Sequence, residues 1–284
     1  MTREQENTAV LDVACDERLA TLDTANPASG AVDRRLRVLG VEICDVTMQR
    51  AIEKIEALIR DRENSCQAVY FVNAHTLNLA CSQPDYRDVL NRAEVVFGDG
   101  TGVRWAARWQ GVRLADNVNG TDLTPAIFAS LAGRGYSYFL LGADEQAVQR
   151  AATRAGEMFA GWHLAGYHHG YVDDEQAARK LIEQINDAAP DLLLVGMGNP
   201  LQERWIDRYR KQLNVAVAIG VGGLLNYWAG DIQRAPTWLR RSGCEWLGLM
   251  LQQPRKAGRY LIGNPLFLAR VIRSFNGKPQ ATVF

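Results

Sequence analysis

The sequence predicts an α/β fold in which a Rossmann-like, mainly parallel sheet is flanked by helices and followed by a C-terminal helical amphipathic appendage. The first observation behind this prediction is a set of short runs rich in β-branched, aromatic and leucine residues, as in buried parallel strands. The runs lie at 68–72, 95–97, 136–141, 162–167, 191–195 and 215–219. The second observation is that small or polar residues follow each run and a segment of helical period comes next. Such repetition indicates right-handed crossovers between parallel strands.

Helices are expected between these strands, and ordered structure is expected to start at 36–41. Thr47 is the expected N-cap of a helix whose apolar positions, from Ile52 to Ile59, share one face. Thr121 or Asp122 is expected to cap another helix. The expected helices after the first lie at 75–81, 84–91, 103–109, 123–131, 145–159, 174–188 and 202–212.

The pattern divides the chain into three parts. Residues 1–34 lack a strong period and include Asn-Pro-Ala-Ser-Gly at 26–30, so we expect a loose or disordered leader. Residues 35–236 hold the alternating strands and helices and form the predicted Rossmann-like domain. Residues 237–284 show no strand pattern and form the predicted basic amphipathic helical appendage.

Charge is balanced over the whole chain but not along it. The 32 Lys and Arg residues match 32 Asp and Glu residues, so no global field attracts nucleic acid. Residues 238–284 carry eight Lys or Arg against one Glu, a surplus of +7. With aromatic residues interspersed, this surplus favours contact with an anionic membrane surface. The alternative is an ordinary core-packing subdomain with a solvated basic face.

The sequence also indicates a compartment. The five cysteines are scattered and form no Cys-x-x-Cys pair, so neither a zinc site nor a disulfide framework is expected. His75, His168 and His169 lack the spacing of metal ligands, and we expect no metal. The N-terminus shows no signal-like apolar stretch, and no run of about 18 apolar residues occurs. We therefore expect a cytoplasmic protein, peripherally associated with the inner face of the cell membrane.

Polar groups follow two of the predicted strands, where α/β sheets bind their ligands. Asp99 lies between Gly98 and Gly100 after the run 95–97, and Asn73 follows the run 68–72. The flanking glycines allow close approach of backbone or substrate, which makes Asp99 the candidate general base. The alternatives are a turn or cap role for Asp99 and an Asx turn at Asn73.

Glycine-rich turns follow three further strands of the predicted sheet. They contain Gly142, then Gly196 and Gly198, then Gly220, Gly222 and Gly223. Backbone amides at turns that open helices bind phosphates, although most single glycines of this kind only permit a tight turn. None of the turns is a P-loop or a dinucleotide fingerprint. Together they favour a nucleotide diphosphate.

Six motifs in this order resemble the WecG/TagA/CpsF family of bacterial glycosyltransferases. They are Phe71-Val72-Asn73-Ala74-His75, Gly98-Asp99-Gly100-Thr101-Gly102, Asn119-Gly120-Thr121-Asp122-Leu123, Gly196 through Ile206, Gly220-Val221-Gly222-Gly223, and Arg234-Ala235-Pro236 through Glu245-Trp246. The resemblance covers about residues 36–270. It implies transfer of a sugar from a UDP-sugar to a polyprenyl-diphosphate-linked sugar, with inversion and without a cofactor, in surface polysaccharide or teichoic-acid-type polymer synthesis.

The resemblance also implies roles for individual residues. Asp99 matches the catalytic aspartate of the family, Asn73 an asparagine on the neighbouring strand end, and Gln202 a glutamine that contacts donor or acceptor. Gln202 and Glu203 can instead satisfy the N-terminus of their helix. The expected substrate-binding residues are His75, Gly142, Gly196, Gly198, Gly222, Gly223, Asn226, Arg234, Arg255 and Arg259.

Two positions depart from the family pattern, and two other functions stay open. Many relatives have arginine where this chain has Asn117, so a cation that stabilises the leaving diphosphate is either missing or supplied by Arg104, Arg113 or the appendage. Many also have aspartate where this chain has Asn226, which leaves the donated sugar open. The alternative functions are a Rossmann oxidoreductase and a non-catalytic UDP-sugar-binding protein. A homo-oligomer is also left open.

Overall fold

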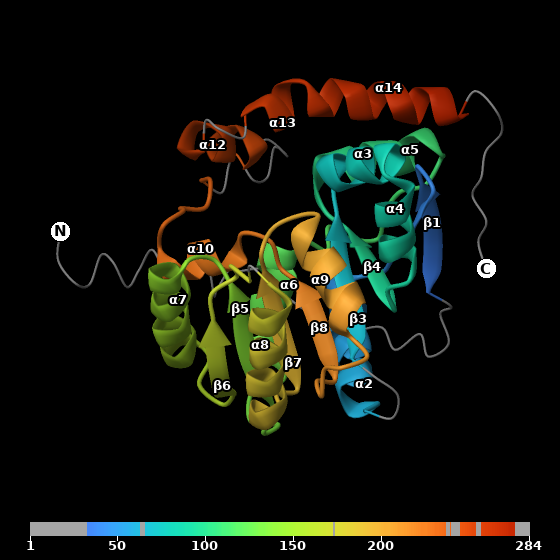
Figure 1. Ribbon diagram of the computed structural model, residues 1–284. Coiled ribbons are helices and arrows are strands. Elements are labelled where there is room, and N and C mark those ends of the chain that lie inside the picture. Colours follow the sequence, from blue (N-terminus) through green and yellow to red (C-terminus); the bar gives the residue numbers. More distant parts are fainter. Residues whose placement is uncertain are drawn as a thin grey trace.

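The computed structural model describes residues 33–62, 66–172, 174–236, 239, 245–253 and 257–275 of the 284-residue chain. Of the predicted leader, residues 1–32 lie outside the described residues, while Arg34 already belongs to the first strand. Within the described part the fold is an eight-stranded, mostly parallel sheet with helices on both faces (Figure 1). The predicted fold class is confirmed.

The strands form one sheet in the order β1-β2-β4-β3-β8-β7-β5-β6. Their bounds are β1 (Arg34–Val38), β2 (Val41–Asp45), β3 (Gln67–Val72), β4 (Val95–Gly98), β5 (Ser137–Gly142), β6 (His163–His168), β7 (Leu192–Gly196) and β8 (Val217–Gly220). All neighbouring pairs are parallel except β1 and β2. The order brings the ends of β4, β3, β8, β7 and β5 side by side at one edge, called the carboxyl edge below.

The antiparallel pair β1 and β2 was not expected from the sequence. The run at 36–41 contains the hairpin turn, at which Leu39 and Gly40 both have positive φ, 50° and 84°. Two such residues make the primed turn that matches the twist of a two-stranded ribbon. The hairpin therefore extends the sheet by two strands beyond β4, with β2 paired to β4 and β1 as the edge strand.

Helices cover both faces of the sheet. Their bounds are α2 (Met48–Arg60), α3 (Ala74–Ser82), α4 (Pro84–Asn91), α5 (Gly100–Trp109), α6 (Gly120–Ser130), α7 (Glu145–Met158), α8 (Glu175–Ala188), α9 (Leu201–Tyr209), α10 (Leu224–Ala229), α12 (Glu245–Gln252), α13 (Ala257–Leu261) and α14 (Gly263–Phe275). Helices α2, α6, α7 and α10 pack on one face, and α3, α4, α5, α8, α9 and α14 on the other. Strand side chains alternate between the two cores, Phe71 facing one and Tyr70 the other.

One of the two helix caps predicted from the sequence is confirmed and the other is wrong. Thr47 caps α2, its hydroxyl accepting from the amide of Arg50 at 3.2 Å. For α6 the prediction of Thr121 or Asp122 was wrong, because the N-cap is Asn119, whose side chain accepts from the amide of Asp122 at 2.9 Å. The helix thus begins earlier and brings Gly120 against Phe71 of β3.

The C-terminal helices form a layer across the carboxyl edge (Figure 1). Helix α14 packs against α3 and α5, and its Phe267 and Val271 are almost fully buried in the same core as Leu77 and Val103. The side-chain Nδ2 of Asn78 donates to the carbonyl of Gly263 at 2.7 Å, which fixes the start of α14 on α3. In the part of the chain that the structure describes, no helix is both long and apolar enough to cross a bilayer.

Candidate active site

Asp99 and Asn73 lie next to each other at the carboxyl edge. Val72 and Gly98 are partners in the parallel ladder of β3 and β4, and the amide of Asp99 donates to the carbonyl of Val72 at 2.8 Å. The side chains of Asp99 and Asn73 are both half-buried. The two groups that the sequence placed on separate strand ends are therefore brought together at the surface of one edge.

The carboxylate of Asp99 does not cap the helix that follows it. Asp99 occupies the N-cap position of α5 without a side-chain cap bond, and the amide of Gly100 instead donates to Oδ1 of Asn117 at 3.2 Å. The turn needs its glycines: Gly100 has φ +84°, and a Cβ on Gly98 would lie 2.8 Å from Val103. The alternative in which the side chain of Asp99 caps α5 is therefore wrong.

Asn73 is used in part by the backbone. Its Oδ1 accepts from the amides of His75 and Thr76 at 3.0 and 3.2 Å, and its own amide donates to the hydroxyl of Thr76 at 2.5 Å. This is a capping box at the start of α3. The alternative of an Asx turn at Asn73 is therefore confirmed for its side-chain oxygen, which accepts from the backbone. The side-chain NH₂ is the group of Asn73 that can act on a ligand.

Arg259, on α13, interacts electrostatically with His75, in the first turn of α3. Burial and, to a smaller extent, the positive charge of Arg259 together lower the pKa of His75 to about 4. Burial also lowers the pKa of Arg259. The imidazole is therefore neutral at neutral pH, and a guanidinium from the appendage lies beside the Asn73 turn. Arg255 lies outside the described residues.

Arg234, in the segment after α10, reaches the first turn of α6. Its Nη1 donates to Oδ1 of Asp122 at 2.6 Å, and its side chain is about nine-tenths buried. The other carboxylate oxygen of Asp122 accepts from the side-chain Nδ2 of Asn119 at 2.6 Å. Arg234 therefore ties this segment to the first turn of α6, and its contact with substrate stays a prediction.

Gln202 lies beneath the edge, with 1% of its surface exposed. Its Oε1 accepts from the amides of Gly198 and Gly222 at 3.2 and 2.9 Å, so one side chain joins the turns after β7 and β8. Its Nε2 donates to Glu203 at 2.7 Å. With both polar atoms committed, Gln202 holds the two turns in place, and its catalytic role stays a prediction.

Glu203 is a fully buried carboxylate that the sequence suggested only as a helix-terminus residue. It accepts from Nδ2 of Asn199 at 2.5 Å, from Gln202, and from the hydroxyl of Tyr86 at 3.0 Å. Burial raises the pKa of Glu203, while these three donors favour its charged form. The available sequence signal was its position three residues before the buried Ile206 on one helix face.

The glycines of the turns fall into two groups. A Cβ on Gly142 would lie 2.5 Å from the carbonyl carbon of Gly196, and one on Gly196 would lie 3.0 Å from the carbonyl oxygen of Gly222. Gly142 and Gly196 therefore let three strand ends pack closely. Around Gly198, Gly222 and Gly223 nothing lies within 4 Å of a Cβ. Those three leave space for a ligand beside the backbone, with the half-buried Asn226 one turn further along α10.

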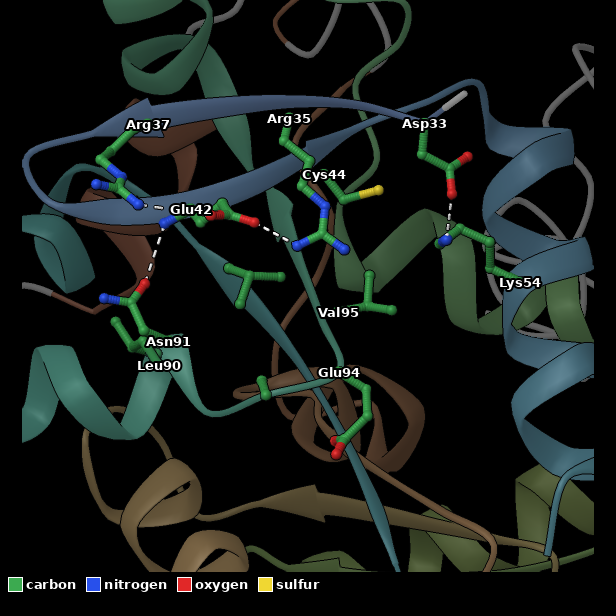
Figure 2. A pocket seen from close by; sticks show the side chains of 12 residues that line it. Asp33, Arg35, Arg37, Glu42, Cys44, Lys54, Leu90, Asn91, Glu94 and Val95 are labelled. Carbon is green, nitrogen blue, oxygen red and sulfur yellow. Dashed lines mark hydrogen bonds and ion pairs between the residues drawn. The ribbon is translucent and has the colours of Figure 1, made fainter. Parts of the chain in front are cut away.

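A separate cavity of about 400 Å³ lies between β2 and the amino end of β4 (Figure 2). Its charged groups pair with one another: Arg35 and Arg37 with Glu42, and Lys54 with Asp33. The backbone amide of Glu42 also donates to Oδ1 of Asn91 at 3.1 Å. The cavity shares no residue with the carboxyl edge.

No cluster of His, Cys, Asp and Glu that could hold a metal occurs among the described residues.

The fold and this edge are those of an α/β protein that binds its ligand beyond the carboxyl ends of its strands. The chain belongs to the WecG/TagA/CpsF family of glycosyl transferases, which it matches over residues 36–281. The resemblance is thereby confirmed, and the chain is a glycosyltransferase, not an oxidoreductase.

Two relatives come from Staphylococcus aureus strains MW2 and NCTC 8325. Each is named N-acetylglucosaminyldiphosphoundecaprenol N-acetyl-beta-D-mannosaminyltransferase. Each is 29% identical to this chain over 240 residues, which covers 84% of this chain and 93% of the relative. The names describe a sugar transferred to a lipid-linked acceptor.

Proposed function

We propose that this protein transfers an N-acetylhexosaminyl-type sugar from a UDP-sugar to a polyprenyl-diphosphate-linked sugar, with inversion, in the synthesis of a cell-envelope polymer. The relatives' names support the acceptor class and the type of sugar. The observation that carries the proposal is the half-buried carboxylate of Asp99 beside Asn73, not engaged as a helix cap, at the carboxyl edge of a glycosyltransferase fold.

In the proposed step, the carboxylate of Asp99 takes the proton from an acceptor hydroxyl. The hydroxyl oxygen forms a bond to the anomeric carbon as the bond from that carbon to the UDP oxygen breaks on the opposite face. The NH₂ of Asn73 orients a sugar hydroxyl. UDP leaves as an anion, and the open turns at Gly198 and Gly222–Gly223 offer backbone amides to its phosphates.

The missing family arginine at Asn117 is replaced, in this proposal, from the appendage. Arg259 acts electrostatically on His75 at the Asn73 turn and is our candidate for stabilising the diphosphate. Residues 237–284 would then both contact an anionic membrane surface and complete the site. The protein would act at the inner face of the cytoplasmic membrane, as a peripheral protein, where a lipid-linked acceptor is presented.

The test is Asp99→Asn, measured as transfer from UDP-N-acetylmannosamine, UDP-glucose and UDP-N-acetylmannosaminuronic acid to a lipid-linked N-acetylglucosamine acceptor. We expect turnover to fall about 10²–10⁴-fold because general base catalysis contributes that much, with unchanged UDP binding and thermal midpoint. Asp174→Asn, which exchanges one capping side chain for another at α8, is the matched control. Activity above a hundredth of wild type would remove Asp99 as base, and UDP binding without any transfer by the wild type would leave a non-catalytic binding protein.

A further inference from the structure

The exposed face of α5 has an unusual composition. Arg104, Trp105, Arg108 and Trp109 are exposed, while Val103, Ala106 and Ala107 face the core. The spacing i, i+1, i+4, i+5 places the two indoles in one row and the two guanidiniums in the next. Trp105 and Trp109 are 48% and 59% exposed. One helix face therefore presents only two large aromatic rings and two cations, and we call it the α5 face.

The cations of the α5 face are available to an external partner. Neither Arg104 nor Arg108 makes an ion pair or hydrogen bond with another described residue through its side chain. Most other exposed arginines of the sheet domain are paired, as Arg92 is with Asp207 and Arg208 with Glu175. Large apolar side chains exposed elsewhere on that domain, Leu201 and Tyr171, stand singly. The combination of paired indoles and uncompensated charge is thus local to α5.

This combination fits the interface of an anionic bilayer. Tryptophan collects at the headgroup level of membranes, since its ring is apolar and its N–H is polar. Arginine beside it is attracted to lipid phosphates and extends its apolar stem along the same surface. A second protein surface would need complementary carboxylates and would have to bury both rings, whereas a headgroup layer accepts the rings and the charges together.

The location of α5 points to the same partner. The helix begins at Gly100, directly after Asp99, and rises about 1.5 Å per residue, which puts Trp105 roughly 9 Å along the axis from the proposed base. α14 packs against α5 and exposes Leu266 and Ile272. In Figure 1 both helices lie at the end of the molecule that holds the carboxyl edge.

We propose that the α5 face docks on anionic headgroups and, together with the apolar side chains of α13 and α14, sets the Asp99 turn at the depth of a lipid-linked diphosphate. The α5 face belongs to the Rossmann-like domain and not to the appendage, so the catalytic helix itself becomes part of the membrane contact. The role in turnover rests on the proposed function, whereas binding to lipid does not.

The first measurement is sedimentation of the full chain with vesicles of phosphatidylcholine containing phosphatidylglycerol. R104Q/R108Q should weaken binding by roughly 10- to 30-fold, because each basic side chain near such a surface contributes about a factor of five. W105S/W109S should also weaken binding, because it removes the two rings that partition to the headgroup level. The effect of R104Q/R108Q should shrink in high salt or on phosphatidylcholine alone. Arg179→Gln with Lys180→Gln, on the exposed face of α8, removes the same charge and should bind like wild type.

The second measurement separates docking from chemistry. W105S/W109S should lose turnover on acceptor embedded in vesicles and keep turnover on a short-chain, water-soluble acceptor. Unchanged vesicle binding in both double variants would overturn the proposal. A change of oligomeric state of W105S/W109S in analytical ultracentrifugation would also overturn it, by showing an interface between copies. If the wild type turns over neither acceptor, the proposed function fails, and vesicle binding alone still decides the role of the α5 face.

Discussion

The two halves of the carboxyl edge are built in different ways. At the ends of β5, β7 and β8 the side chains point inward: Gln202 and Glu203 are buried and bond to the turns, which leaves backbone as the surface. At the ends of β3 and β4 the surface consists of the half-buried side chains of Asn73 and Asp99. The first half is suited to a rigid, generic contact with phosphates, and the second to chemistry on a particular sugar.

The difference extends to what covers each half. The appendage helix α14 packs against α3 and α5, which begin at Asn73 and Asp99, and the neighbouring α13 places the charge of Arg259 within electrostatic range of His75. The turns of β7 and β8 are instead held from below, through α9 and the hydroxyl of Tyr86. A buried side chain that supports the turns of the first half, such as Gln202, should therefore affect stability and nucleotide affinity together, whereas a residue on the second half should affect them separately.

The largest expected effect that tests this comparison is that of Gln202→Ala. The change removes the acceptor of two turn amides and one donor to the buried Glu203, so we expect the free energy of unfolding to fall by about 2–4 kcal/mol. Asn73→Ala removes only a helix cap on the other half and should cost about 1 kcal/mol. Urea denaturation of the two variants decides between them, and an equal loss would contradict the division of the edge.

A matched pair of glycines gives the next effect. Gly142→Ala places a Cβ 2.5 Å from the carbonyl carbon of Gly196 at φ +144°, and should destabilise the protein by about 1–3 kcal/mol. The Cβ that Gly223→Ala adds would have no other atom within 4 Å. This change should therefore leave the thermal midpoint unchanged while weakening UDP binding. Calorimetry with UDP gives both quantities. If Gly223→Ala binds UDP as wild type does, the ligand does not approach that turn.

The smallest effect concerns His75 and pH. Because the folded state lowers the pKa of His75 from 6.5 to about 4, the unfolded chain binds the proton more tightly. The free energy of unfolding should fall as the pH drops from about 6.5 toward 4, by on the order of 1 kcal/mol for a half-buried group. His75→Gln should flatten this dependence and His163→Gln, at an exposed ring, should not.

Arg259→Gln extends the same titration to the appendage. It removes the charge that lowers the pKa of His75 and leaves the burial, so the pKa should rise by part of the total shift, measurable by NMR of the imidazole. No change in that pKa would mean that Arg259 does not lie against His75 in solution.

Much of this site could be predicted from local sequence. Asp99 and Asn73 end apolar runs, and strand ends in a parallel sheet share an edge, so their closeness followed once the runs were recognised. The burial of Gln202 and Glu203 could not be predicted, because polar residues in a first helical turn are usually solvated and only the packing of α9 under two turns encloses them. The hairpin of β1 and β2 was missed because its turn lies inside an apolar run without the usual Asn-Gly signal.

The sequence by itself determined the alternation of strands and helices, the glycine turns, and which residues stand at strand ends, since these depend on side-chain period and local backbone freedom. Only the tertiary structure decided that β3 lies between β4 and β8, that α14 buries Phe267 and Val271 against α3 and α5, and that α5 turns two tryptophans outward. These features depend on contacts between residues up to nearly 200 positions apart, such as Asn78 and Arg270, which no local pattern encodes.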